Sequence, residues 1–154
     1  MRILVQICII LIFFGCSNIK NKTNYPISVS LTVPKDKYSL ILKHHFYKNF
    51  NTSDKNLNKT TVKAHLIFNT NNALSNNGSN NLTIVNGTVN FQIFDKLNAK
   101  VIKSGSISSS INTGSVSSLY GVDKNNDFAK ERISKYLASK LYRKILLNIK
   151  NGEN

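Results

Sequence analysis

The stretch "NGTVNFQIFDKLNAKVIKSGSISSSINT", residues 86–113, decides the fold, because apolar and polar residues alternate on both sides of a turn. Before the turn, Val89, Phe91 and Ile93 occupy every second position, which places them on one face of a strand. The turn itself is "DKLN", residues 95–98, and a second alternating run follows it. The stretch therefore predicts a long antiparallel hairpin with strands over residues 82–94 and 99–113.

Serines occupy alternate positions of the second strand of this hairpin. Because side chains two residues apart share a face, these serines make one face of the strand polar. We expect that face to be solvated or to face a partner. The serines are Ser104, Ser106, Ser108 and Ser110.

The residues before the hairpin predict a strand, a helix and another strand. "ISVSLTV", residues 27–33, alternates strictly and ends at Pro34, as a strand with one buried face does. Residues 37–50 have apolar residues at helical spacing, and Asp36 is placed to cap that helix. Residues 60–70 alternate again and predict the second strand.

The segment between this strand and the hairpin, residues 69–81, consists almost wholly of Asn, Ser and Gly and predicts a long loop. Residues 114–122 predict a second loop.

A long amphipathic helix is predicted after the hairpin, from about residue 126 to 149, with Asn126 or Asp127 as its cap. Ala129, Tyr136 and Leu146 are expected beside its apolar stripe. The stripe consists of Phe128, Ile133, Leu137, Leu141, Ile145 and Ile149.

The element order is therefore β-α-β-β-β-α. A four-stranded sheet with both helices packed on one face would bury the apolar stripes of both helices. This predicts a two-layer α+β sandwich in a single domain over residues 27–150, followed by a short tail, 151–154.

The N-terminus has the pattern of an export signal. Arg2 provides a positive start, and residues 3–14 are apolar apart from Gln6. About 12 apolar residues are too few to span a bilayer, which needs roughly 20, and fit the apolar region of a signal peptide. A buried strand is the alternative interpretation, but it would need cover on both faces.

Gly15 followed by Cys16 resembles the bacterial lipoprotein box, in which the cysteine sulfur receives a lipid, although Phe13 stands where leucine is usual. On this interpretation residues 1–15 are the signal peptide, Cys16 is the lipidation site, and residues 16–26 tether the lipid to the domain. The other cysteine, Cys8, lies inside the signal. The processed chain would have one cysteine and no internal disulfide.

The net charge of +14 in 154 residues favours an acidic partner: nucleic acid, anionic lipid or an acidic protein surface. Heavy use of Lys, Asn and Ile also fits AT-rich codons, which would make part of the excess an effect of base composition. An exported protein would not meet nucleic acid.

Taken together, the signal, the hairpin of residues 86–113 and the segment "SSLYGVDKNNDFAKERISKYLASKLYRKI", residues 117–145, resemble the LptE family of lipopolysaccharide-assembly lipoproteins. The resemblance implies a lipid-anchored protein on the periplasmic side of the outer membrane, without catalytic residues or cofactors. It would plug and assemble the LptD β-barrel and assist lipopolysaccharide insertion. It also implies that cations on the last helix contact lipopolysaccharide or the barrel: Arg132, Lys135, Lys140, Arg143 and Lys144.

No metal site is expected. His44 and His45 are adjacent on a helix, so they point about 100° apart and do not converge. Two other classes of protein remain open. One is another periplasmic adaptor lipoprotein of an envelope transport complex, and the other is a basic α+β domain that binds nucleic acid.

Overall fold

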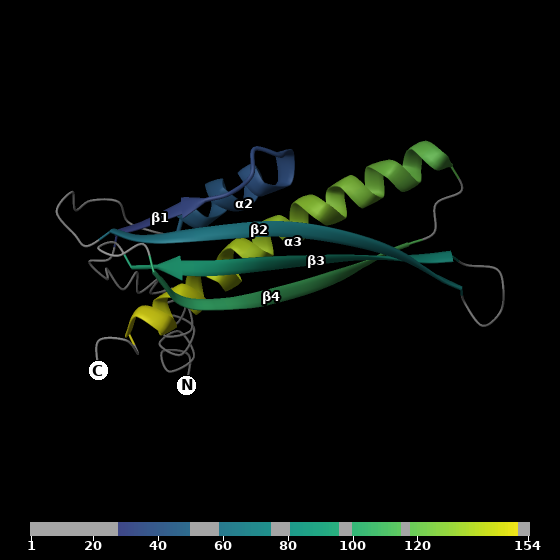
Figure 1. The fold of residues 1–154 in the computed structure, drawn as a ribbon. Coiled ribbons are helices and arrows are strands. Elements are labelled where there is room, and N and C mark those ends of the chain that lie inside the picture. Colours follow the sequence, from purple (N-terminus) through teal and green to yellow (C-terminus); the bar gives the residue numbers. More distant parts are fainter. Residues whose placement is uncertain (1–27, 50–58, 75–80, 96–99, 115–117, 151–154) are drawn as a thin grey trace, which may run out of the picture.

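Four strands form one sheet, and two helices cover one of its faces (Figure 1). This computed structural model describes residues 28–49, 59–74, 81–95, 100–114 and 118–150. The elements are β1 (Ser28–Thr32), α2 (Lys37–Tyr47), β2 (Lys59–Leu74), β3 (Asn81–Phe94), β4 (Val101–Thr113) and α3 (Leu119–Lys150). The predicted α+β fold and its element order are confirmed.

The strands lie in the order β1-β2-β3-β4. β1 pairs in parallel with the first five residues of β2, and α2 forms the crossover between the two strands. β2, β3 and β4 pair antiparallel, with Val62 opposite Ile93 and Val89 opposite Ile107. A register shift between Ile93 and Phe94 marks a bulge at the start of the predicted hairpin turn.

The core lies between the sheet and the helices, because every second strand residue points toward α2 and α3. Apolar burial of this kind is the main term that stabilises the fold. The buried apolar residues are Val29, Leu31, Leu42, Phe46, Val62, Ala64, Val85, Val89, Phe91, Ile93, Ala129, Ile133, Leu137, Ala138, Leu141 and Ile145.

Gly87 lets α3 approach the sheet closely. A Cβ atom at this position of β3 would lie 2.4 Å from Cγ2 of Ile133 and 2.9 Å from Cε1 of Phe68. Both distances are shorter than carbon atoms tolerate, so a side chain here would push the helix or the phenylalanine ring away.

The predicted cap of α2 is present. Oδ1 of Asp36 accepts hydrogen bonds from the backbone N–H groups of Tyr38 (3.1 Å) and Ser39 (2.9 Å). These bonds help to lower the pKa of Asp36, although its partial burial, the largest effect, acts in the opposite direction.

Several boundary predictions were wrong, and α2 ends at Tyr47 instead of residue 50. Residues 69–74 continue β2 and residue 81 begins β3, so the predicted loop is shorter than the sequence suggested. α3 begins at Leu119 instead of residue 126. At this start, the hydroxyl of Ser118 accepts a hydrogen bond from the backbone N–H of Gly121 (3.1 Å), as a helix cap does. Asn126 and Asp127 therefore lie inside the helix.

Phe128 is a further correction, because it does not belong to the buried stripe. Its side chain is 62% exposed, and that of Tyr136 is 54% exposed. The buried row instead begins at Ala129 and continues at intervals of four residues through Ile133 to Ile145.

The predictions for the signal peptide, Cys16 and the tether fall outside the described residues, as do those for residues 75–80 and the tail.

Candidate functional site

The five cations predicted to contact a partner are all exposed on α3. In the part of the chain that the structure describes, none of the five forms an ion pair like those that Lys37 makes with Asp127 and Glu131. They do not form one cluster, and they lie on different sides of the helix. The exposure agrees with a role in binding but does not identify a ligand.

Lys140 lies on the side of α3 that faces the sheet edge. Its Nζ donates a hydrogen bond to the backbone carbonyl of Ser108 in β4 (3.1 Å), and it also lies 5.3 Å from the ring centroid of Tyr136. β4 is an edge strand, so on its outer side, away from β3, no strand supplies donors to its carbonyl groups.

Lys135 lies on the other side of α3, toward α2. Burial is the main cause of the lowered pKa of His45 in α2, and the positive charges of Lys48, Lys135 and His44 add to it. Lys135 and Lys140 therefore flank the exposed side of α3 from opposite directions.

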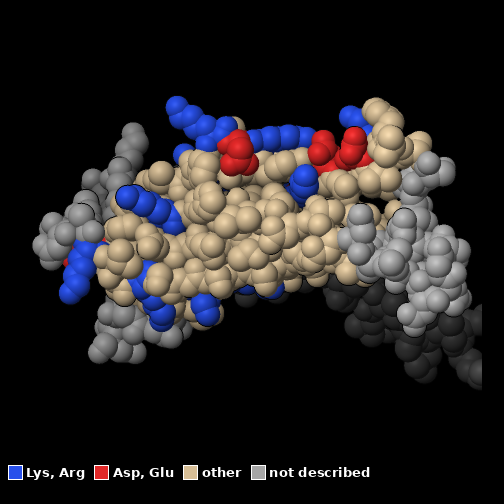
Figure 2. Space-filling view, turned by 45° about the vertical axis from the view of Figure 1, so that its right-hand side comes forward, with Lys and Arg blue, Asp and Glu red and all other residues tan. Residues whose placement is uncertain are grey.

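The face of the sheet that the helices leave uncovered is mainly polar and almost uncharged, with Ile67 as an exposed apolar residue on it. The predicted serine row is confirmed there, since Ser104, Ser106, Ser108 and Ser110 are all exposed. Asn90 and Gln92 of β3 point to the same side. Figure 2 shows a broad band without charged side chains across the middle of the molecule, with Lys and Arg at its margins and Asp and Glu along its upper margin.

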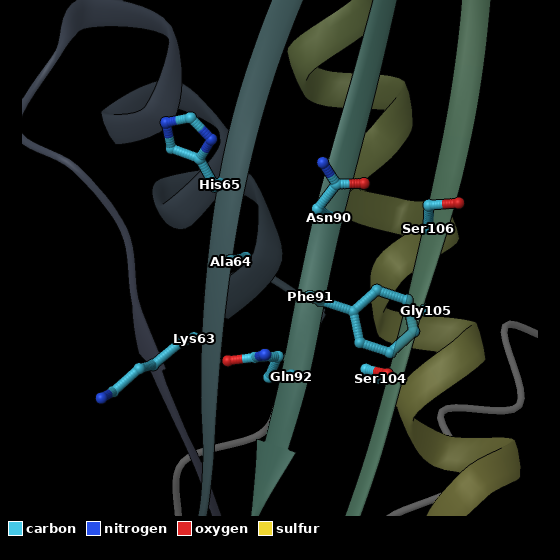
Figure 3. Close-up of a pocket in the computed structure, with 9 residues that line it drawn as sticks. All are labelled: Lys63, Ala64, His65, Asn90, Phe91, Gln92, Ser104, Gly105 and Ser106. Atoms are coloured by element: carbon cyan, nitrogen blue, oxygen red, sulfur yellow. The ribbon is translucent and has the colours of Figure 1, made fainter. Parts of the chain in front are cut away.

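A shallow trough of about 460 Å³ lies on this open face (Figure 3). The strand register aligns two rows of polar residues across β2, β3 and β4. The first row consists of His65, Asn90 and Ser106. The other row consists of Lys63, Gln92 and Ser104.

Between the two rows lie Ala64 and Phe91, whose side chains are buried on the helix side, and Gly105, which has no side chain, so the floor of the trough is low there. The Phe91 ring packs against Gly105, where a Cβ atom would lie 2.9 Å from its Cζ.

The trough offers hydrogen-bond donors and acceptors without a carboxylate among its lining residues. Amide and hydroxyl groups suit the recognition of polar groups on a ligand or partner. The serine side of the trough was predictable from the sequence, whereas the roles of Asn90 and His65 were not predicted. Both residues lie at strand positions that alternate with buried residues, and this alternation would have placed their side chains on the open face.

A polar junction joins the start of α2 to α3. The hydroxyl of Tyr38 donates to Oδ1 of Asp127 (2.6 Å), and Nζ of Lys37 lies 3.6 Å from Asp127 and 3.1 Å from Glu131. Burial, followed by the bond to Asp127, raises the pKa of Tyr38 to about 12. The same bond is the main cause of the lowered pKa of Asp127.

Replacing Tyr38 with phenylalanine is expected to give a stability loss with a defined pH window. The lowered pKa of Asp127 means that its bond stabilises the fold above the unfolded value, about 3.9, and that this stabilisation disappears as the pH falls below it. The raised pKa of Tyr38 means that the bond is present below pH ~10 and is lost as the pH rises toward about 12.

The melting temperatures of the wild type and of Tyr38→Phe should therefore differ between these limits and converge outside them. Tyr136→Phe, which changes an exposed ring, is the control and should show no such window. A difference between wild type and Tyr38→Phe that is independent of pH would contradict the assignment of the bond.

Neither a metal cluster nor a membrane-spanning helix is found in the described segments. No group of three or more His, Cys, Asp or Glu side chains converges there. The rings of His44 and His45 lie nearly perpendicular, with centroids 5.7 Å apart. Neither α2 nor α3 combines the length and apolarity that crossing a bilayer requires.

Known proteins resemble this chain in fold alone. No protein-family model and no curated protein matches the sequence. The crystal structure of rare lipoprotein B from Shewanella oneidensis is similar with a TM-score of 0.63 and 10% identity, over 83% of this chain and 98% of that chain. A minor lipoprotein from Acinetobacter baumannii is similar with a TM-score of 0.57 and 20% identity, over 80% and 94%. The chain therefore has a fold that bacterial lipoproteins also have.

Proposed function

We infer that this chain is a lipid-anchored protein of the bacterial envelope, held on the periplasmic side of the outer membrane through Cys16. We further infer that it plugs and assembles the LptD barrel and assists lipopolysaccharide insertion, acting by binding and not by catalysis. The observation that carries this proposal is the sandwich of four strands and two helices, which nearly the whole of rare lipoprotein B shares. The lipoprotein box before the domain supports the anchor.

The uncovered face of the sheet fits the inside of a barrel. The lumen of an outer-membrane barrel is polar, and a partner inside it needs hydrogen-bonding groups without unpaired buried charges. The open face supplies amides and hydroxyls from β3 and β4, with Lys63 at the margin of the trough. The exposed cations of α3 suit the phosphates of lipopolysaccharide through charge-assisted hydrogen bonds.

Lipid attachment is tested by labelling cells with radioactive or clickable palmitate. We expect a labelled band from the wild type and from Cys8→Ala, which changes a cysteine inside the signal. Cys16→Ala should give no labelled band, because no other cysteine follows the signal. A labelled Cys16→Ala protein would contradict the assignment.

The partner is tested by affinity capture of the full chain from detergent-solubilised outer membrane, with identification of the bound proteins. We expect LptD in the wild-type sample and its loss with Ser106→Arg, which adds a charged, bulky side chain to the open face. Leu40→Arg adds the same side chain on exposed α2 and should retain the barrel. Capture of a different envelope transport complex would instead favour the adaptor-lipoprotein alternative.

A further inference from the structure

The outer side of α3 combines exposed apolar residues with cations. Phe128, Tyr136 and Leu147 are 62%, 54% and 59% exposed, and Arg132 and Arg143 lie between them. These five residues, here called the outer face of α3, follow one another at intervals of four or seven residues. Such intervals correspond to one or two helical turns, so the five side chains share one side of the helix over about 28 Å.

Lys135 and Lys140 extend the positive charge to both flanks of this outer face. Lys135 lies toward α2 and Lys140 toward the sheet edge, as described above. The aliphatic parts of such side chains can lie along an apolar surface while their charged ends reach outward.

The acidic residues of the same helix lie elsewhere, and the first of them, Asp123, is about 180° around the helix from Arg132. Asp127 and Glu131 turn toward α2, where both pair with Lys37. Their positions differ from Arg132 by roughly 140° and 100° around the helix, given 100° per residue. The outer face of α3 is therefore apolar and cationic without a carboxylate of its own.

We propose that the outer face of α3 docks on the headgroup surface of an anionic phospholipid bilayer. Helices that lie in the membrane interface have aromatic and aliphatic residues on one side with Lys and Arg around them. The guanidinium groups of Arg132 and Arg143 match lipid phosphates in charge and in hydrogen-bond geometry. Phe128, Tyr136 and Leu147 would reach between the headgroups, where Tyr keeps its hydroxyl in water.

The position of the N-terminus agrees with this proposal. Twelve residues, 16–27, precede the described domain, and a chain of that length spans at most roughly 40 Å. If Cys16 has the lipid inferred above, the domain cannot leave the vicinity of the bilayer, which raises the effective concentration of the outer face at the surface. In this respect alone the proposal rests on the proposed function. A lipid-anchored domain meets the bilayer surface before it meets a barrel, so the two proposals are compatible.

The chain has no tryptophan, which allows a site-specific test on the full-length protein. In Tyr136→Trp the new fluorophore lies on the outer face of α3. In the matched control, His65→Trp, it lies on the open face of the sheet, in the opposite layer. Both proteins are reconstituted into vesicles of brominated phosphatidylglycerol, and both share any attachment made by the N-terminus.

We expect the fluorescence of Tyr136→Trp to be quenched and shifted to shorter wavelength, and that of His65→Trp to remain unquenched. Vesicles of brominated phosphatidylcholine, or 0.5 M salt, should weaken the quenching because the attraction is electrostatic. The quenching gives the ratio of docked to undocked protein. Adding Arg132→Gln and Arg143→Gln to Tyr136→Trp should lower this ratio about fivefold for each arginine replaced.

Lys48→Gln with Lys103→Gln removes the same charge at exposed positions away from the outer face, and should change the ratio by less than about twofold. A second pair, Phe128→Ser with Leu147→Ser, should also reduce the quenching. Circular dichroism checks that each variant is folded.

The proposal is overturned if Tyr136→Trp is unquenched, or if His65→Trp is quenched equally. It is also overturned if the control lysines matter as much as the arginines. A third outcome is that vesicles cause no quenching while Arg132→Gln and Arg143→Gln abolish the capture of LptD. That outcome would overturn the proposal and assign the outer face to a protein partner. Because the vesicles contain no barrel, failure here leaves the capture experiment with LptD unaffected.

Discussion

Replacing Phe46 with alanine is expected to lower the free energy of unfolding by about 3–5 kcal/mol, the usual cost of removing a buried aromatic ring. Phe46 is fully buried and lies between the helices and the sheet. Its ring is 5.7 Å from that of Tyr47 and 6.4 Å from that of Tyr142 in α3, both in edge-to-face arrangements. Alanine would leave a cavity where α2 and α3 meet.

Urea unfolding followed by circular dichroism measures this loss. Leu40→Ala lies on the same helix with half of its side chain exposed, and should cost less than about 0.5 kcal/mol. If the two variants were equally destabilised, α2 could not be packed with Phe46 inward and Leu40 outward.

Replacing Gly87 with alanine should cost about 1–3 kcal/mol, because one added methyl group overpacks a filled core. The new Cβ atom would overlap Cγ2 of Ile133 and an edge of the Phe68 ring, so α3 would have to move away from β3. Gly114→Ala is the matched control, since nothing lies within 4 Å of the position a Cβ atom would take there. That control should be neutral or slightly stabilising.

The cause of the Gly87 effect can be isolated with a double-mutant cycle. Ile133→Ala alone should be destabilising, because it empties a fully buried site. When Gly87→Ala is added to Ile133→Ala, the clashing methyl group is already absent, so the second substitution should cost much less than it does alone. Additive losses would show that contact with Ile133 is not what makes glycine necessary.

The strands were predictable because side chains alternate with a period of two residues. Residues 86–113 gave the hairpin within two residues of its strand ends, and the sheet was inferred from the strand pattern. Asn71 and its neighbours in β2 were missed because asparagine favours turns. Their partners in β3, among them Ile84 opposite Asn71, hold these residues in a ladder that local preference opposes.

The beginning of α3 was missed for a similar reason. Gly121 and the serines before it read as a loop, yet Ser118 provides a cap and the helix propagates from there. A serine three residues before Gly121 indicates a helix start, but the low helix propensity of glycine led to the prediction of a loop.

The candidate site was only partly predictable. The exposure of the five cations was predictable because charged positions on a helix follow from its period, whereas Phe128 was placed in the apolar stripe although it lies five residues before Ile133. Ala129, one residue later, belongs to the buried row because it lies four residues before Ile133. Large apolar residues on a helix surface have no local signature, so their exposure required the packing of α3 against the sheet.

The hydrogen bond from Lys140 to the carbonyl of Ser108 has a consequence for solubility. From Ser104 to Thr113, β4 has no charge and no proline at the free edge of the sheet, and such edges tend to pair with strands of other molecules and start aggregates. The ammonium group of Lys140 occupies one of the acceptors that an incoming strand would need. A helix residue thereby protects the edge, and a concentrated solution of the protein should stay clear only while that lysine is present.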